Sequence, residues 1–241
     1  MLSLAWSPDG TRLASGDTSG EISTWRVSDG AQITLYHGHT RLARALAWSP
    51  DGTLLASGGD FGDSTIQVWH ADSGQHIFTY TALYRVFAVG WSAQGERLAA
   101  CGFSGGVHTW SALTGSQPFI YTGHSGPVYT LGWSPDGTAL ASAGQDGQVH
   151  IWEDATGRVR YIYRGHTRAV KALAWSSDGT RIASGGDDAL LRIWQASTGE
   201  EALTPGVQTS WIRALAWSPD GRCIAGASGR AVNVVSIEEK S

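Results

Sequence analysis

Histidine and aspartate have the widest chemical range of any residue types in this 241-residue chain, because they bind metals and transfer protons. The chain has eight histidines. Three of them directly follow a glycine: His39, His124 and His166. Three others lie in or beside one predicted outer strand: His37, His70 and His76. His70 and His76 are six residues apart across a turn, which is no recognised ligand spacing, so we predict no metal site.

Two aspartate-rich turns have the composition of a calcium loop but lack its ligand series. They are Asp60-Phe61-Gly62-Asp63 and Gly185-Gly186-Asp187-Asp188, and neither continues into the pattern of oxygen ligands that a calcium loop needs. The sequence also lacks Gly-x-Ser-x-Gly, a phosphate-binding loop and a dinucleotide fingerprint. No nucleophile and base stand at a spacing that indicates catalysis. We therefore expect a non-enzymatic protein without a cofactor.

The two remaining histidines share one position in a repeated pattern. His108 and His150 each stand two residues before a tryptophan. The same offset holds other polar residues elsewhere: Ser23, Gln67 and Arg192. A position that accepts all of these side chains is expected to face solvent.

The element that must position these residues is a tandem repeat, the feature to look for first in any sequence. A Trp-Ser-(Pro)-Asp-Gly motif, with Ala-Gln in place of Pro-Asp after Trp91, recurs with tryptophan at 6, 48, 91, 133, 175 and 217, at intervals of 42, 43, 42, 42 and 42 residues. A second tryptophan follows in the first five units: Trp25, Trp69, Trp110, Trp152 and Trp194. Val235 stands where the sixth is expected.

Each unit reads as four short strands separated by turns. In the fourth unit the strands are expected at 128–133, 139–143, 148–152 and 158–163, with Ser-Pro-Asp-Gly, Gly-Gln-Asp-Gly and Thr-Gly turns between them. Four strands in about 42 residues match the length of one β-propeller blade. A β-sandwich is the alternative, but a sandwich does not need a sequence period.

The Gly-His pairs at 38–39, 123–124 and 165–166 carry a family resemblance. With the tryptophan spacing, they make the chain similar to the WD-repeat (WD40) family over its whole length, in the near-uniform form of bacterial arrays. The resemblance implies that the histidine forms a hydrogen-bonded tetrad with a serine, an aspartate and a tryptophan. The implied sets are His39, Ser57, Asp63 and Trp69; His124, Ser142, Asp146 and Trp152; and His166, Ser184, Asp188 and Trp194.

Three units depart from this pattern. The third has Ala82, Ala100 and Ser104 in place of histidine, serine and aspartate, and the sixth has Gln208, Gly226 and Val235. The first lacks the Gly-His pair and has Ser19 in place of aspartate. The terminal Trp-Asp pair of the family is absent throughout. We expect these three blades to depend mainly on apolar packing and to be locally less stable.

The predicted fold is an all-β, six-repeat propeller whose last blade lacks its outer strand. It forms a single domain, 1–241, with repeats at approximately 1–37, 38–80, 81–122, 123–164, 165–206 and 207–241. The third strand of the last repeat, Ala231–Ile237, is then an open edge. Three interpretations stay open: a three-stranded last blade that closes the ring, a piece of a longer array, and completion by another chain, including self-association.

Composition excludes some partners. The net charge of −4 gives no basic field for nucleic acid or anionic lipid, and no apolar run approaches the roughly 18 residues of a membrane span. Cys101 and Cys223 fall in strands of different repeats and are expected to be small buried side chains without a disulfide. A cytoplasmic protein is the expectation.

A binding surface is predicted where loops enter the innermost strands. The position four residues before the repeat tryptophan holds Arg44, Phe87, Tyr129, Lys171 and Arg213. Nearby positions hold Arg41, Arg85, Arg168 and Trp211. Arginine and aromatic residues dominate binding hot spots, and arginine suits carboxylate and phosphate groups.

The functional hypothesis is a protein-interaction scaffold that binds an acidic or phosphorylated peptide on this Arg/aromatic face. The plainer interpretation is a solvated rim that balances the neighbouring aspartates. A propeller that binds glycans or small ligands, and a sensor or assembly fragment of a larger signalling protein, are the alternatives.

Overall fold

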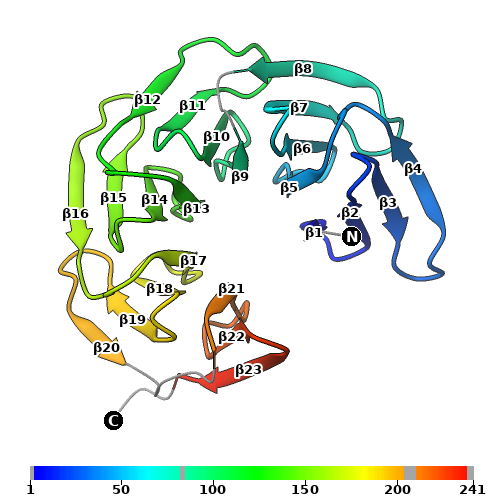
Figure 1. Ribbon diagram of the computed structural model, residues 1–241. Coiled ribbons are helices and arrows are strands. Elements are labelled where there is room, and N and C mark those ends of the chain that lie inside the picture. Colours follow the sequence, from blue (N-terminus) through cyan, green and yellow to red (C-terminus); the bar gives the residue numbers. More distant parts are fainter. Residues whose placement is uncertain (1–2, 82–84, 204–209, 238–241) are drawn as a thin grey trace. The chain divides into compact units, whose positions relative to one another are not determined.

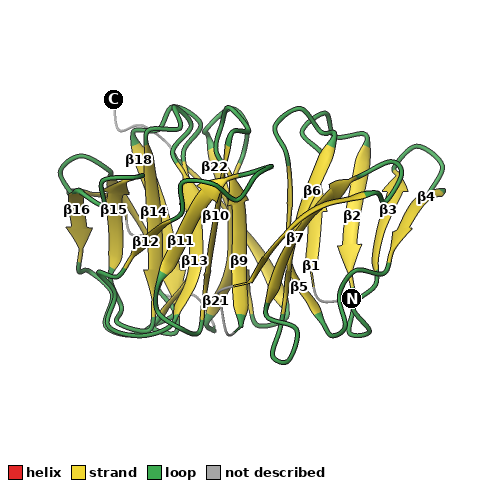
Figure 2. Cartoon of the chain, turned by 90° about the horizontal axis from the view of Figure 1, so that it is seen from above, coloured by secondary structure: helices red, strands yellow, loops and turns green. Residues whose placement is uncertain are grey.

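The computed structural model describes residues 3–81, 85–203 and 210–237, and these form strands and turns without a helix (Figure 2). The strands make six antiparallel sheets. Five sheets have four strands and the sixth has three, in the order β21-β22-β23. The predicted all-β propeller of six blades, with the fourth strand missing from the last blade, is confirmed.

The chain divides into two compact units of three blades each, Met1–Tyr121 and Thr122–Ser241. Within each unit, the first strands of consecutive blades lie side by side, as β1, β5 and β9 do in the first unit (Figure 1). The strands of the first unit are β1 (Ser3–Trp6), β2 (Arg12–Gly16), β3 (Ile22–Arg26), β4 (Gln32–Tyr36), β5 (Ala43–Trp48), β6 (Leu54–Gly59), β7 (Thr65–His70), β8 (His76–Thr81), β9 (Val86–Trp91), β10 (Arg97–Gly102), β11 (Val107–Ser111) and β12 (Phe119–Tyr121).

The second unit repeats this order from blade four onward. Its strands are β13 (Val128–Trp133), β14 (Ala139–Gly144), β15 (Val149–Glu153), β16 (Val159–Tyr163), β17 (Val170–Trp175), β18 (Arg181–Gly186), β19 (Leu191–Gln195), β20 (Glu201–Leu203), β21 (Ile212–Trp217), β22 (Cys223–Ser228) and β23 (Ala231–Ser236). The strand predicted at 128–133 is β13, and the other three strands predicted in this blade are correct to within one residue.

The Ser-Pro-Asp-Gly motif forms the turn between the first and second strands. In the fourth blade, Ser134 Oγ donates to Asp136 at 2.5 Å, and Asp136 accepts from the Thr138 amide at 3.0 Å. Ser134 Oγ in turn accepts from the Ala139 amide at 3.0 Å. Gly137 has φ of 71°, which only glycine adopts at little cost. The motif therefore satisfies its own polar groups and fixes the connection between the strands.

Within each compact unit, the repeat tryptophan of the first strand links a blade to the one before it. Its indole N–H donates to the carbonyl oxygen of the residue that precedes the equivalent tryptophan. The bonds are Trp48 to Ala5 (2.9 Å), Trp91 to Ala47 (3.0 Å), Trp175 to Gly132 (3.0 Å) and Trp217 to Ala174 (3.0 Å). The recurrent tryptophan thus satisfies its only polar group across the interface between two blades.

A tyrosine on the fourth strand makes a second link to the following blade. It stacks on the third-strand tryptophan of that blade with the rings nearly parallel. The pairs are Tyr36–Trp69, Tyr80–Trp110 and Tyr163–Trp194, with centroids 4.4, 4.1 and 4.4 Å apart. These tryptophans are fully buried. Tyrosine also recurs at 36, 80, 121 and 163 in the sequence, a period that marks this position without any structure.

The third blade shows what the loss of a tetrad serine does. In the first blade Trp25 Nε1 donates to Ser15 Oγ at 2.8 Å, but Ala100 occupies the equivalent position in β10. Within the described residues, the buried Nε1 of Trp110 has no acceptor. A buried donor without a partner costs about 1–3 kcal/mol, which gives a physical basis for the prediction that this blade is locally less stable.

Ala100→Ser is expected to stabilise the protein by about 1 kcal/mol, because the new hydroxyl accepts from Trp110 and donates to the backbone, as Ser57 does toward the carbonyl of Gln67. The urea midpoint measured by far-UV circular dichroism checks this. The matched control is Ala99→Ser on the same strand, where no indole is left without an acceptor and no gain is expected. An equal response to both substitutions would contradict the assignment.

Candidate functional site

The structure brings together all three predicted tetrads. Each histidine lies between an aspartate and a serine, and the third-strand tryptophan donates to the same serine. The His Nδ1–Asp distances are 3.2 Å (His39–Asp63), 2.8 Å (His124–Asp146) and 2.9 Å (His166–Asp188). The His Nε2–Ser distances are 2.8 Å (Ser57), 2.9 Å (Ser142) and 2.8 Å (Ser184). The Trp Nε1–Ser distances are 3.2 Å (Trp69), 3.1 Å (Trp152) and 3.1 Å (Trp194).

One arrangement of protons satisfies every polar group in such a tetrad. The indole N–H donates to the serine oxygen, which is also hydrogen-bonded to Nε2 of the histidine, and Nδ1–H donates to the aspartate. Serine, histidine and aspartate have the order of a hydrolase triad. However, Ser57, Ser142 and Ser184 are fully buried. A serine that accepts from an indole in a closed interior has no access to a substrate, so these sets have a structural role within each blade that contains one.

The tetrad aspartates are ionised at neutral pH. Burial is the largest influence on Asp146 and acts to raise its pKa, but the hydrogen bond from His124, the charge of His124 and backbone amides outweigh it and lower the pKa to about 2. The same balance lowers the pKa values of Asp63 and Asp188. The carboxylates therefore act as fixed acceptors and not as proton donors.

The departures from the tetrad pattern are partly visible. In the first blade only the Ser15–Trp25 bond remains of the tetrad. In the third blade Ala100 leaves the indole of Trp110 without an acceptor in the described structure. Ala82 and Gln208, which stand at the histidine positions of the third and sixth repeats, lie outside the described residues.

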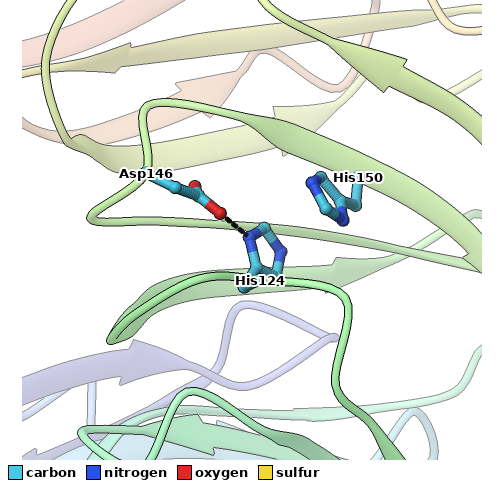
Figure 3. Close-up of side chains that lie close together, drawn as sticks. All are labelled: His124, Asp146 and His150. Carbon is cyan, nitrogen blue, oxygen red and sulfur yellow. Dashed lines mark hydrogen bonds and ion pairs between the residues drawn. The ribbon is translucent and has the colours of Figure 1, made fainter.

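His124, Asp146 and His150 are near enough to one another to raise the possibility of a metal site. Their potential ligand atoms all lie within 4.8 Å of one another (Figure 3). Both nitrogens of His124 already make hydrogen bonds within the tetrad. The His150 ring stacks on His124 with centroids 3.9 Å apart and an interplanar angle of 20°. Nearly parallel rings direct their in-plane lone pairs along similar lines, so the pair is better described as a stack than as a ligand set.

The prediction that the position of His108 and His150 faces solvent is wrong. His108, His150 and the equivalent Gln67 are 6 %, 2 % and 6 % exposed. His108 Nδ1 lies 3.1 Å from the hydroxyl of Tyr80, and Gln67 accepts from the hydroxyl of Tyr36 at 2.6 Å. At His108 and Gln67, the stacking tyrosine of the preceding blade contacts this position, and a pattern read within one repeat does not include that tyrosine.

His150 makes the folded state sensitive to acid. Burial, with a smaller contribution from the charge of His124, lowers its pKa from 6.5 to about 4. Below pH 6.5 the unfolded chain therefore binds a proton at His150 that the folded chain does not. The corresponding part of the stability is complete above pH 6.5 and is lost as the pH falls toward 4.

His150→Gln places in the fourth blade the residue that the second blade has at Gln67, and it removes this titration. Between pH 7.5 and pH 5 the variant is expected to lose about 2 kcal/mol less unfolding free energy than the wild type. Urea unfolding at the two pH values measures the difference. His76→Gln, at an exposed position, controls for loss of an imidazole. Parallel pH profiles for His150→Gln and the wild type would refute the prediction.

The position predicted four residues before the repeat tryptophan is a β-bulge, which the sequence analysis did not predict. At this position, one extra residue of the first strand has no partner in the hydrogen-bonded ladder with the second strand. The five bulged residues are Arg44, Phe87, Tyr129, Lys171 and Arg213. A bulge redirects a side chain out of the regular alternation. In the fourth and fifth blades, Gly144 and Gly186 face the bulge, and an added Cβ would collide with the carbonyl oxygens of Pro127 and Ala169.

In the first unit, two cations of this surface, Arg44 and Arg85, share one carboxylate. Asp60 accepts from Arg44 at 3.0 Å and from both Nε and Nη2 of Arg85. Both guanidinium groups lie over the Phe87 ring, 5.2 and 5.5 Å from its centroid. Burial acts to raise the pKa of Asp60, but Arg85, the Phe61 amide and Arg44 lower it overall. The cluster has two cations and one anion, so part of the charge predicted for this surface is neutralised internally.

The second unit pairs a cation with an aromatic ring twice. Lys171 Nζ lies 3.2 Å from the Tyr129 centroid and 3.6 Å from Asp187. Arg213 lies 5.1 Å from the centroid of Trp211, which is 51 % exposed. In the part of the chain that the structure describes, no carboxylate pairs with three further arginines of the surface: Arg41, Arg168 and Arg213. The charges of these three arginines are therefore not neutralised by a described carboxylate.

Both cysteines are free thiols in the structure. Cys101 is fully buried, and burial raises the pKa of its thiol well above the ordinary value. Cys223 is half-buried on β22. The buried Cys101 thiol therefore lacks the low pKa of a reactive cysteine site.

The sheets and the tetrads correspond to a known family. The model of the WD domain, G-beta repeat, matches residues 1–26, 30–70, 115–153, 157–195 and 203–234. The segment between the second and third matches holds most of the third blade, whose tetrad is lost. The chain belongs to the WD40-repeat family of β-propellers. These propellers are in general non-enzymatic scaffolds for protein interactions. No curated protein shows significant similarity to the chain.

A membrane-spanning helix is not found among the described residues.

Proposed function

We propose that the chain binds an acidic or phosphorylated segment of a protein partner through the Arg/aromatic surface. Each unit carries its own patch of this surface: Arg41, Arg44, Arg85 and Phe87 in the first unit, and Tyr129, Arg168, Lys171, Trp211 and Arg213 in the second. The observation that carries the proposal is the bulge itself, which recurs in five blades and places a cation or an aromatic ring outside the ladder each time. Cations stacked on rings keep a fixed orientation, which lowers the entropy lost on binding.

The internal ion pairs distinguish the cations that order the surface from those that are available to contact a ligand. Arg44 and Arg85 are held by Asp60, and Lys171 by Asp187. These three order the surface, whereas Arg41, Arg168 and Arg213 offer charge that no described carboxylate neutralises. A phosphate or carboxylate group gains most from cations of the second kind, because no existing pair has to be broken.

A glycan-binding function has less support from the side chains. Stacking of successive sugars would need equivalent aromatic rings exposed in several blades. The equivalent third-strand tryptophans Trp69, Trp110, Trp152 and Trp194 are fully buried. Trp211 is exposed but stands outside the repeat pattern.

The triple variant Arg41→Glu, Arg168→Glu, Arg213→Glu tests the proposal. Two fluorescent peptides of alternating glutamate and serine, with and without phosphorylated serines, serve as probes in anisotropy titrations. The variant is expected to bind the phosphorylated peptide at least about tenfold more weakly, because each reversal replaces attraction by repulsion. Binding by the wild type is expected to weaken as salt rises.

The matched control reverses three arginines at the other ends of the strands: Arg26→Glu, Arg158→Glu, Arg222→Glu. It changes the net charge by the same amount and is expected to bind nearly as the wild type does. Equal losses in the two triple variants would reduce the effect to overall charge. Unchanged binding by the first variant would refute the proposal.

A second interaction surface is favoured by one observation on the last blade. Strand β23 pairs with β22, and two of its valines, Val232 and Val234, are 69 % and 67 % exposed. Exposed β-branched residues on a strand without a neighbour on its other side, as far as the structure describes it, favour the addition of another strand, from a second copy or from a partner.

Val232→Lys with Val234→Lys is expected to block such pairing, because lysines on an edge strand oppose strand addition. Light scattering at several concentrations compares the mass of the wild type with that of the variant. A wild-type dimer that becomes a monomer in the variant supports self-association through β23. A wild-type monomer at every concentration rules out self-association and leaves a partner strand as the occupant.

A further inference from the structure

Arg12 closes the interface between the first and second blades. Its guanidinium lies over the Trp48 ring, 4.8 Å from the centroid. Its Nη2 donates to the carbonyl of Gly52 at 2.7 Å, and Nη1 pairs with Asp72 at 2.6 Å. The Arg12 side chain is only 18 % exposed. The chain itself therefore shows how an arginine fits between two of its blades.

The repeat gives the equivalent positions at the other interfaces. Arg12 stands six residues after the first-strand tryptophan, and Asp72 stands three residues after the third-strand tryptophan of the next blade. Between the second and third blades these positions hold Leu54 and Leu113, an apolar pair that lines the same kind of cavity. Between the fourth and fifth blades they hold Ala139 and Ser197. Of these three interfaces, this is the one at which neither position carries a long side chain.

A cavity of about 550 Å³ lies at this interface between the fourth and fifth blades. Its lining includes Trp175, Gly179 and Ser197, the equivalents of the three residues that Arg12 contacts. Between the fifth and sixth blades the corresponding cavity is lined by its own Arg181. The fourth interface thus keeps the ring and the glycine that receive an arginine, without an arginine of its own at that position.

The charges of the cavity suit a cation. Asp136 and Asp178 line it, and hydrogen bonds, first those from Ser134 and Ser176, lower the pKa values of both carboxyl groups. Arg160 also lines the cavity, but it pairs with Glu153 at 3.3 Å and donates to Thr138 at 3.2 Å. Glu153 also pairs with Arg158, so the cavity lining carries two carboxylates and one guanidinium, a net negative charge that favours a cationic ligand.

We propose that this cavity binds the guanidinium group of an arginine side chain from a partner protein. The guanidinium stacks on Trp175 and donates to the carbonyl of Gly179, as Arg12 does on Trp48 and Gly52. A lysine fits less well, because its ammonium is compact and strongly hydrated and lacks the planar fork. The site lies at the opposite ends of the strands from the Arg/aromatic surface, and it does not depend on the function proposed for that surface.

The direct test is a titration followed by amide NMR shifts of Gly179 and Ser197 and by the Trp175 indole signal, assigned with Trp175→Phe. The probe is N-acetyl-L-arginine methylamide, and the lysine analogue is its control. Saturable shifts at these signals in the millimolar range are expected for the arginine probe. Absence of saturable shifts, or equal responses to arginine and lysine, would overturn the proposal. Tighter binding of free L-arginine would overturn the assignment to a protein side chain.

Two variants and one control substitution extend the test. Ser197→Asp restores the equivalent of Asp72 at an exposed position and is expected to tighten binding of the probe by about two- to fivefold, the contribution of an exposed ion pair. Ser116→Asp, an exposed turn residue of the third blade, adds the same charge elsewhere and is expected to change nothing. Ala139→Arg supplies an internal arginine and is expected to abolish binding. Ser197→Asp stands as a test by itself if Ala139→Arg does not fold, and no effect of Ser197→Asp would count against the site.

Discussion

The link between neighbouring blades is the interaction on which the other features depend. A four-stranded sheet has two faces, and each blade buries a face by packing on the next one. The indole N–H of the first-strand tryptophan fixes this packing, because it reaches the carbonyl that precedes the equivalent tryptophan of the preceding blade. The stacked tyrosine and tryptophan fix the outer strands in the same way. A hydrogen bond of about 1 kcal/mol and a stack of about 0.5–1.5 kcal/mol recur with the repeat.

These links set the register of the first strands, and both proposed binding surfaces follow from that register. At the start of the strand, the bulge directs residues such as Arg44 and Lys171 away from the ladder. At its end, the tryptophan ring forms one wall of the space between two blades, which Arg12 fills in one case and a cavity occupies in another. The tetrads add a polar core that is satisfied internally, and they leave the strand ends available for binding.

The features that depend on the repeat could be predicted from the sequence. The tryptophan spacing predicts the blades and their strands, and the Gly-His pairs indicate which serine, aspartate and tryptophan meet. Contacts that cross from one repeat to another could not be predicted in this way. His150 is buried by its stack on His124 and by its surroundings, although the polar residues at the same position in other repeats favoured exposure. Arg44 and Arg85 come from different blades to reach Asp60, 16 and 25 residues away in sequence.

Function in such a fold belongs to the positions where equivalent residues differ. The tetrad residues and the first-strand tryptophans make the same structural contacts in every blade that has them. They therefore indicate the family and no particular partner. The bulged position varies between cations and aromatic rings, and the position of Arg12 varies between arginine, leucine, alanine and cysteine. Where Arg12 meets Asp72, or Leu54 faces Leu113, the chain completes its own interface. Where the chain has Ala139 and Ser197 at these positions, the interface keeps a cavity. A ligand in that cavity can make the contacts that Arg12 makes with Trp48 and Gly52.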